Sequence, residues 1–135
     1  MKILVTGANG QVGQEFVYIT KCIASEPTPQ HEIVCFDRTG LDITDAQHAE
    51  SVIVSERPDL VINCAAYTAV DKAESEREVS FAINETGAKN LALVCHYIGA
   101  ALIHISTDYV FSGDKTEPYS ETDFAVPSGV YGESK

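Results

Sequence analysis

Residues 6–13 have the sequence TGANGQVG, and this stretch decides the fold. Its glycines, Gly7, Gly10 and Gly13, are three residues apart. An apolar run typical of a strand precedes them, and apolar residues at helical spacing follow from residue 11 to residue 24. A strand, a glycine-rich turn and a helix, with an acidic residue at the end of the next strand, are typical of a dinucleotide-binding site.

Each glycine in this stretch has its own physical reason. Gly7 permits the tight turn after the strand, and Gly10 lets the backbone approach a pyrophosphate. Gly13 allows the helix to pack closely against the strand, and the helix N-terminus then offers free N–H groups to phosphates. The alternative is a plain turn between a strand and a helix, which the surrounding context disfavours.

The rest of the chain alternates apolar runs with helical patterns. The predicted strands are residues 2–7, 31–37, 59–66 and 101–106, and the predicted helices are residues 11–24, 43–56 and 70–98. Continuous apolar strands separated by amphipathic helices indicate a parallel sheet covered on both faces. Right-handed crossovers then give an α/β fold, a Rossmann-like doubly wound parallel sheet.

Local signals add detail to the predicted helices and loops. Thr44 is the predicted N-cap of the second helix, and Gly99 is predicted to stop the third. The segment ASEPTPQHE, residues 24–32, predicts a long surface turn. The apolar face of the first helix is predicted to consist of Val12, Phe16, Ile19 and Ile23.

Composition excludes several classes of function. The 135 residues predict one soluble domain, with 44% hydrophobic and 21% charged residues. A formal charge of −11 without a basic patch argues against a nucleic-acid partner. The first residues, MKILVTGANG, lack the apolar length of a signal peptide or a membrane span. We therefore expect a cytoplasmic protein with no membrane partner.

The cysteines and histidines predict neither a metal site nor a disulfide. The cysteines lack close metal-ligand spacing, and no histidine pair accompanies them. Cys35 and Cys64 lie inside apolar runs and are predicted to be buried and reduced. His104, between two isoleucines, is predicted to be a satisfied strand residue.

The residues after the second predicted strand leave the choice of cofactor open. Asp37 ends that strand and could accept hydrogen bonds from an adenosine ribose. Arg38 follows directly and could bind a 2′-phosphate. The sequence therefore predicts NADPH or NADH without choosing between them.

The chain ends on VYGESK, in which Tyr131 and Lys135 are four positions apart and share one helix face. A tyrosine with an ordinary pKa of about 10 is a poor acid–base catalyst near neutrality, and a nearby ammonium favours its ionised form. Thr107 follows a predicted strand and could donate a hydrogen bond to a substrate carbonyl. The alternatives are a surface pair and a turn cap.

Together these motifs resemble the dTDP-4-dehydrorhamnose reductase family, in the extended branch of the short-chain dehydrogenase/reductase superfamily. The segments GANGQVG, LDITD, PDLVINCAAYTAVDKAE, STDYVF, PYSETD and VYGESK occur in the order and spacing expected of that family. AAYTAVDKAE and STDYVF are the most specific of them. The resemblance covers nearly the whole chain, with residues 24–32 atypical.

The resemblance implies NADPH- or NADH-dependent reduction of the 4-keto group of dTDP-4-dehydro-L-rhamnose to dTDP-L-rhamnose, a precursor of surface polysaccharides. It implies that Thr107, Tyr131 and Lys135 are catalytic and that Thr107 and Asp108 lie near the substrate. The implied cofactor-binding residues are Gly7, Gly10, Gln11, Val12, Gly13, Asp37, Asp42, Ile43, Ala66, Tyr67, Thr68, Tyr131 and Lys135.

In the extended superfamily, a C-terminal portion holds most of the nucleotide sugar. Nothing before Lys135 is built for that task, so we expect residues 1–135 to be an incomplete NAD(P)-binding domain. Such an N-terminal fragment would be inactive, whereas its full-length parent would be active and could form a homodimer. Two alternatives stay open: another nucleotide-sugar epimerase or dehydratase of the superfamily, and a non-catalytic regulatory homologue. The role of Asn84 also stays open between sheet support, a proton relay and a mid-helix polar contact.

Overall fold

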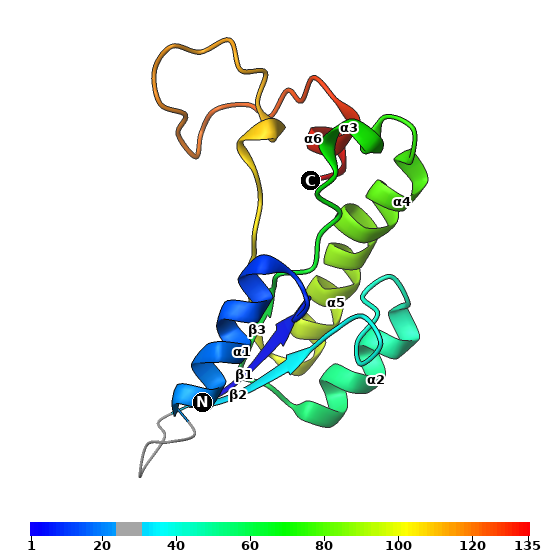
Figure 1. The fold of residues 1–135 in the computed structure, drawn as a ribbon, viewed down its shortest axis with the longest axis vertical. Coiled ribbons are helices and arrows are strands. Elements are labelled where there is room, and N and C mark those ends of the chain that lie inside the picture. The colour runs from blue at the N-terminus through cyan, green and yellow to red at the C-terminus, as the bar shows by residue number, and fades with distance from the viewer. Residues whose placement is uncertain (24–30) are drawn as a thin grey trace.

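The computed structural model describes residues 1–23 and 31–135, which form a four-stranded parallel sheet with helices on both faces (Figure 1). Residues 24–30 of the predicted surface turn, and the side chain of Ile23, lie outside the described residues. The predicted Rossmann-like α/β fold is confirmed. The strands are β1 (Lys2–Thr6), β2 (Glu32–Phe36), β3 (Leu60–Asn63) and β4 (Ala101–His104).

The order of the strands, β2-β1-β3-β4, makes the winding of the sheet reverse at β1. The chain passes from β1 to β2 on one side and then returns to β3 on the other side of β1. Val5 accordingly pairs with Cys35 in β2 and with Ile62 in β3. In doubly wound sheets, ligands bind outside the carboxyl ends of the strands at such a reversal. The residues that follow β1 and β3 are therefore placed for binding.

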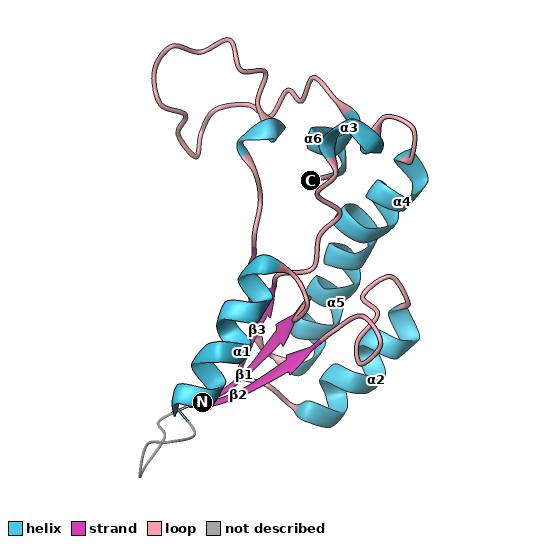
Figure 2. Cartoon of the chain, in the orientation of Figure 1, coloured by secondary structure: helices cyan, strands magenta, loops and turns pink. Residues whose placement is uncertain are grey.

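The helices cover the two faces of the sheet unequally (Figures 1 and 2). α2 (Ala46–Glu56) and α5 (Ala88–Ile98) pack against each other on one face, and α1 (Gln11–Ile23) lies on the other. On the face of α1, Ile103 of β4 keeps 51% of its surface exposed, so this edge is uncovered. The main core lies beneath α2 and α5 and includes Leu4, Leu41, Ile53, Val61 and Leu91.

α1 buries a different stripe from the one that its apolar residues predicted. Val12 and Ile19 keep 48% and 40% of their surface exposed, whereas Gly13 is buried. A Cβ on Gly13 would lie 2.2 Å from the carbonyl oxygen of Gly7. The helix therefore contacts the preceding turn backbone to backbone at Gly13, and this contact decides which face points inward.

Asp45, rather than the predicted Thr44, caps α2. The Asp45 carboxylate accepts hydrogen bonds from the backbone N–H groups of Gln47 and His48, each at 3.0 Å. The Thr44 hydroxyl instead donates to the carboxylate of Asp42, at 2.7 Å. Both residue types are good caps, so the choice depends on the local bond between Thr44 and Asp42, two residues earlier in the chain.

The predicted helix over residues 70–98 consists of several segments. A turn separates the first two, and a π-helical segment leads directly into α5. The wider turn of the π-helical segment changes the direction in which its side chains point. Asn84 and Gly87 are both buried as a result. Gly99, with φ of +75°, ends α5 and confirms the predicted stop. The segments before α5 are α3 (Val70–Ala73), α4 (Arg77–Phe81) and η1 (Ala82–Gly87).

A long loop over residues 111–129 joins the 3-10 helix η2 (Asp108–Val110) to α6 (Val130–Ser134). Phe111 and Tyr119 stack within it, with ring centroids 4.1 Å apart. α6 then packs against α3, α4 and η2, above the carboxyl end of the sheet (Figure 1). The loop thus returns the end of the chain to the edge where β1 and β3 end.

Leu91 and Leu93 provide a matched test of this packing. Leu91 is fully buried in the core, whereas Leu93, on the same helix, keeps 60% of its surface exposed. We expect Leu91→Ala to lower the free energy of unfolding by about 2–5 kcal/mol. Leu93→Ala should change it by about 0.5 kcal/mol or less. Urea denaturation of both variants measures the difference, and equal losses would contradict the described core.

Candidate functional site

The glycine turn brings the start of α1 against β1 and β3. Gly7 has φ of +70°, and a Cβ there would lie 2.6 Å from the backbone nitrogen of Ala65, just after β3. A Cβ on Gly10 would lie 3.3 Å from the Gly7 carbonyl oxygen, a milder contact than that of Gly13. Gly7 and Gly13 thus hold the helix close to the strands, and Gly10 keeps the approach to its N-terminus open.

A cavity of about 220 Å³ lies beside this turn, where the winding of the sheet reverses. The first backbone bond at the start of α1 is donated by Gln14 to Gly10, so the N–H groups of Gln11 and Val12 precede it and stay available. The lining comes from the glycine turn, the turn after β2, the residues after β3 and η1. It consists of Gly7, Asn9, Gly10, Arg38, Leu41, Asp42, Ile43, Thr44, Cys64, Ala65, Ala66 and Ile83.

The predicted cofactor-binding residues fall into three groups according to their position relative to this cavity. Gly7, Gly10, Asp42, Ile43 and Ala66 line it. Gln11, Val12 and Gly13 form the first turn of α1, and Tyr67 and Thr68 follow Ala66 along the chain. Asp37 is outside the lining, and Tyr131 and Lys135 lie at α6. Their roles toward a cofactor remain predictions.

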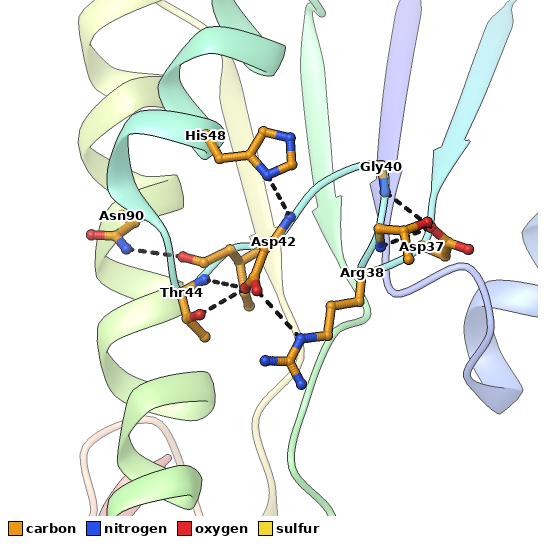
Figure 3. A network of polar contacts seen from close by, with 9 residues as sticks. Asp37, Arg38, Gly40, Asp42, Thr44, His48 and Asn90 are labelled. Carbon is orange, nitrogen blue, oxygen red and sulfur yellow. Dashed lines mark hydrogen bonds and ion pairs between the residues drawn. The ribbon is translucent and has the colours of Figure 1, made fainter.

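Asp37 braces the turn that follows β2 (Figure 3). Its Oδ1 accepts hydrogen bonds from the Thr39 hydroxyl, at 2.7 Å, and from the backbone N–H groups of Thr39 and Gly40, both at 3.0 Å. Its Oδ2 accepts from the Asn9 amide at 3.2 Å. These bonds, the Thr39 hydroxyl first, hold the pKa of Asp37 below its ordinary value of 3.8.

Asp42 organises the second half of the same turn (Figure 3). Its Oδ1 accepts from the backbone N–H of Thr44 at 2.9 Å and from the Thr44 hydroxyl, and its Oδ2 accepts from Arg38 Nε at 3.3 Å. The Thr44 hydroxyl is the main cause that holds the pKa of Asp42 below 3.8. Asp42 is therefore charged at neutral pH and lies between Arg38 and Thr44.

Contacts from η1 and α5 hold Ile43 in position. Asn90 of α5 donates to the Ile43 carbonyl oxygen at 2.9 Å (Figure 3). A Cβ on Gly87 would lie 2.6 Å from Ile43 Cδ1, so the missing side chain at Gly87 makes room for this isoleucine. Because Ile43 is buried and also lines the cavity, α5 sets the position of this wall.

Asn84 ties the segment after β3 to the end of the chain. Its Oδ1 accepts from the Tyr67 backbone N–H at 2.8 Å, and its Nδ2 donates to the Tyr67 carbonyl at 3.0 Å. The same Nδ2 donates to Ser134 Oγ at 2.9 Å. Asn84 is 2% exposed, so these bonds replace water entirely. Of the three roles left open by the sequence, a mid-helix polar contact is the nearest to what is observed, and this contact bridges two segments of the chain.

Ser134 completes this network inside α6. Its hydroxyl donates to the Tyr131 carbonyl at 2.8 Å, and it lies 2.9 Å from the Ser80 hydroxyl. A serine has one hydroxyl proton, so Ser80 must donate to Ser134. Ser80, Asn84 and Ser134 are all buried, and within residues 1–23 and 31–135 no buried side-chain polar atom lacks a partner.

Contacts from α3, α4 and η2 hold the rest of α6. Glu74 accepts a hydrogen bond from the Val130 N–H at 2.9 Å, which satisfies the first donor of the helix. Arg77 forms an ion pair with Glu133 at 2.8 Å. A Cβ on Gly132 would lie 2.1 Å from the carbonyl oxygen of Tyr109, so α6 contacts η2 backbone to backbone.

The predicted catalytic residues are gathered around this docked helix. Lys135 Nζ donates to the Ile105 carbonyl oxygen, just after β4, and burial lowers the pKa of Lys135 below 10.5. The Tyr131 ring meets the Tyr109 ring edge to face, with centroids 5.6 Å apart. The Thr107 hydroxyl donates to the Asp108 carboxylate at 3.2 Å, so a substrate carbonyl would have to compete for this proton.

His104 is a satisfied strand residue. Its Nδ1 lies 3.0 Å from the Asn63 amide nitrogen, and Asn63 in turn accepts from the buried Thr6 hydroxyl at 2.6 Å. The amide can only donate, so Nδ1 must be the unprotonated nitrogen. Burial, followed by the charge of Lys135, lowers the pKa of His104, which is consistent with a neutral ring.

The described cysteines are free thiols. Cys95 is buried, whereas Cys35 and Cys64 are only half-buried, so their predicted full burial is wrong. Cys64 loses cover because it lies at the carboxyl end of β3 and lines the cavity. In the described ranges, no three His, Cys, Asp or Glu residues come together as a metal site, and no helix is long and apolar enough to span a membrane.

The glycine turn and the start of α1 fit a dinucleotide. The missing side chain at Gly10 leaves the approach to the start of α1 open, and this end of the helix offers backbone N–H groups to phosphates. A model of the family described as RmlD substrate binding domain matches residues 1–135. The chain belongs to this family.

Relatives and solved structures agree with this assignment. A dTDP-4-dehydrorhamnose reductase of Mycobacterium tuberculosis is 44% identical over 99% of the chain. A crystal structure of a dTDP-4-dehydrorhamnose reductase from Clostridium acetobutylicum is 42% identical, with a TM-score of 0.89 over 99% of the chain. A Bacillus anthracis dTDP-4-dehydrorhamnose reductase in complex with NADP is also 42% identical, with a TM-score of 0.87 over 98% of the chain. The chain covers 43%, 46% and 45% of these three proteins.

Several residues of the site could not be found from the sequence. Leu41 and Thr44 lie within the segment LDITD and Ala65 lies within PDLVINCAAYTAVDKAE, but membership of these segments was their only signal and did not single them out. Ile83 reaches the cavity from η1, and nothing in the apolar spacing indicates a π-helical segment. Ser134 precedes Lys135 directly, but its burial depends on the docking of α6.

Asn84→Ala tests the bridge between the two segments. The change leaves the backbone polar groups of Tyr67 and the Ser134 hydroxyl without this partner, so we expect unfolding free energy to fall by about 2–4 kcal/mol. Asn90→Ala, which removes a single bond to Ile43, should lower it by about 1 kcal/mol. Urea denaturation compares the two variants. Equal losses would argue against the bridge.

Proposed function

We propose that residues 1–135 are the N-terminal, NAD(P)-binding portion of a dTDP-4-dehydrorhamnose reductase. The proposed reaction reduces the 4-keto group of dTDP-4-dehydro-L-rhamnose with NADPH or NADH. The observation that carries the proposal is a glycine turn with an adjacent cavity at the carboxyl end of the sheet, together with Thr107, Tyr131 and Lys135, in a chain of this family.

The chain spans less than half of the relatives that it matches. We therefore assign the nucleotide-sugar site to additional C-terminal length, and expect the isolated chain not to turn over substrate. The proposal extends to a full-length homodimer that acts in the cytoplasm on a small nucleotide sugar, without a nucleic-acid or membrane partner.

In this proposal the cavity holds the cofactor through the chain's own groups. The N–H groups at Gln11 and Val12 bind the phosphates of the cofactor. The segment of Ala66, Tyr67 and Thr68 lies along the cofactor. Asn84 keeps the backbone of Tyr67 in place. The Tyr67 hydroxyl donates to Glu76 at 2.7 Å, which raises its pKa and keeps it neutral. When bound, the nicotinamide supplies the hydride.

In this proposal, residues of α6 and residues after β4 deliver a proton to the 4-keto oxygen of the substrate. Tyr131 donates its phenolic proton to the oxygen that gains charge, and Thr107 donates a hydrogen bond to the same oxygen. The Lys135 ammonium favours the ionised tyrosine that remains. The bond from Lys135 to the Ile105 carbonyl supports this arrangement, because it draws the end of α6 to the strand that leads to Thr107.

Tyr131→Phe in the full-length reductase tests the proposal. Loss of the phenolic proton should lower kcat for the 4-keto sugar by about 10²–10⁴-fold, with NADPH affinity nearly unchanged. Tyr109→Phe is the matched control, because the two rings touch and each variant loses one hydroxyl. It should keep kcat within about threefold, as expected of a residue without a role in proton transfer.

Oxidation of NADPH by each variant, with the 4-keto sugar as substrate, provides the measurement. Full activity of Tyr131→Phe would contradict the proposed role of this residue. A full-length protein that binds NADPH but reduces no 4-keto sugar would contradict the proposed reaction.

A further inference from the structure

Three polar side chains form a row across the carboxyl ends of neighbouring strands. Thr6 of β1 pairs with Asn63 of β3, and Asn63 pairs with His104 of β4, so the three side chains lie on one face of the sheet. The Thr6 hydroxyl donates to Asn63 Oδ1 at 2.6 Å, and Asn63 Nδ2 donates to His104 Nδ1 at 3.0 Å. Thr6 and Asn63 are buried, so water does not replace these bonds.

The amide of Asn63 also holds one wall of the cavity. Its Oδ1 accepts a second hydrogen bond, from the backbone N–H of Ala65 at 3.1 Å. Ala65 lines the cavity, and its backbone nitrogen would lie 2.6 Å from a Cβ on Gly7. The orientation of the Asn63 amide therefore fixes the segment against which the glycine turn packs.

The protonation state of His104 decides which way this amide can point. An unprotonated Nδ1 accepts from the NH₂ group of Asn63 and leaves Oδ1 to Ala65. A proton on Nδ1 would place two donors face to face. Turning the amide over would not repair this, because its NH₂ group would then meet the Ala65 N–H, which can only donate. Protonation of His104 thus costs either its bond to Asn63 or the bond from Ala65.

The groups packed around His104 favour the neutral ring. β3 and α5 pack against β4, and β3 faces the ring with the neutral amide of Asn63. The titratable residue that α5 buries is Cys95, and burial raises the pKa of this thiol to about 11, so it carries no charge near neutrality. Within the part of the chain that the structure describes, Lys135 of α6 is the one charged side chain that acts on the ring. Burial, followed by this charge, lowers the pKa of His104 below 6.5.

We propose that His104 is a positioning residue for the cofactor site, and that a proton on its ring weakens cofactor binding. The neutral ring orients Asn63, and Asn63 holds Ala65 against the glycine turn. Protonation releases Ala65 and disturbs this wall of the cavity. The inference rests on the proposed function, because it requires the cofactor to bind beside Ala65.

Titration of the ¹⁵N-labelled chain with NADP⁺ over a series of pH values tests the inference. The carbon-bound ring protons of His104 give the midpoint of its own titration in the same samples. His104→Asn is the reference variant, because the asparagine oxygen can accept in place of Nδ1 and does not titrate. Its affinity for NADP⁺ should stay within about twofold of the unsubstituted chain at neutral pH.

As the pH falls through the midpoint of His104, the dissociation constant should rise about 3–10-fold more in the unsubstituted chain than in His104→Asn, as expected for one lost hydrogen bond. Any titration of NADP⁺ itself cancels in this comparison. His104→Phe keeps a ring without an acceptor, so at neutral pH it should bind about 3–10-fold more weakly than His104→Asn.

His96→Asn is the matched control, because it makes the same change at a histidine that is exposed in the last turn of α5. It should keep the pH dependence of the unsubstituted chain. A pH dependence that is the same in His104→Asn as in the unsubstituted chain would overturn the inference.

The ligand-free chain separates this inference from the proposed cofactor site. Without ligand, the amide signal of Ala65 should move with the same midpoint as the His104 ring, and this movement should be absent in His104→Asn. An Ala65 signal that does not follow the ring would overturn the inference alone. NADP⁺ that binds at no pH would overturn the proposed cofactor site, and with it the effect of His104 on binding.

Discussion

The backbone contact between Gly13 and the Gly7 carbonyl is the constraint on which the rest of the structure depends. The distance that a Cβ on Gly13 would have, 2.2 Å, leaves no room for any side chain. This contact sets which face of α1 meets the sheet, and it leaves Val12 and Ile19 outside. It also places the first N–H groups of α1 beside the end of β1, where the winding of the sheet reverses.

A second, polar constraint joins this half of the site to the end of the chain. Asn84 is bonded to the backbone of Tyr67 and to Ser134, one residue before Lys135. The glycine turn works through steric exclusion, whereas this bridge works through buried hydrogen bonds that must all be satisfied. The chain therefore positions the predicted cofactor segment and the predicted catalytic helix through one shared side chain.

The sequence was sufficient for the parts of the fold that local patterns determine. The four apolar runs became parallel strands, Gly7 and Gly13 make the predicted tight turn and close helix packing, and Gly99 ends α5 as predicted. Features that apolar spacing does not encode, a local hydrogen bond and a change of helix type, decided what was predicted wrongly. Asp42 binds the Thr44 hydroxyl and leaves the cap of α2 to Asp45, and the π-helical segment turns Asn84 inward within a stretch that looked like one helix.

The same distinction holds for the candidate site. Gly7, Gly10, Asp42, Ile43 and Ala66 were predicted by motif and line the cavity. The bonding of Asp37 to its own turn could not be predicted, because it depends on the backbone conformation of residues 37–40. The sequence left Asp37 and Arg38 as equal candidates, and in the structure Arg38 lines the cavity whereas Asp37 does not.

The central claim is that the glycine turn and the residues after β2 and β3 form one preformed dinucleotide site. Titration of the ¹⁵N-labelled chain with NADP⁺, followed by amide chemical shifts, tests it most directly. We predict the largest shifts at Gly10, Gln11 and Val12, with further shifts at residues 38–44 and 64–66. Saturating NADP⁺ that leaves these amides unchanged, or shifts only amides elsewhere in the chain, would contradict the claim.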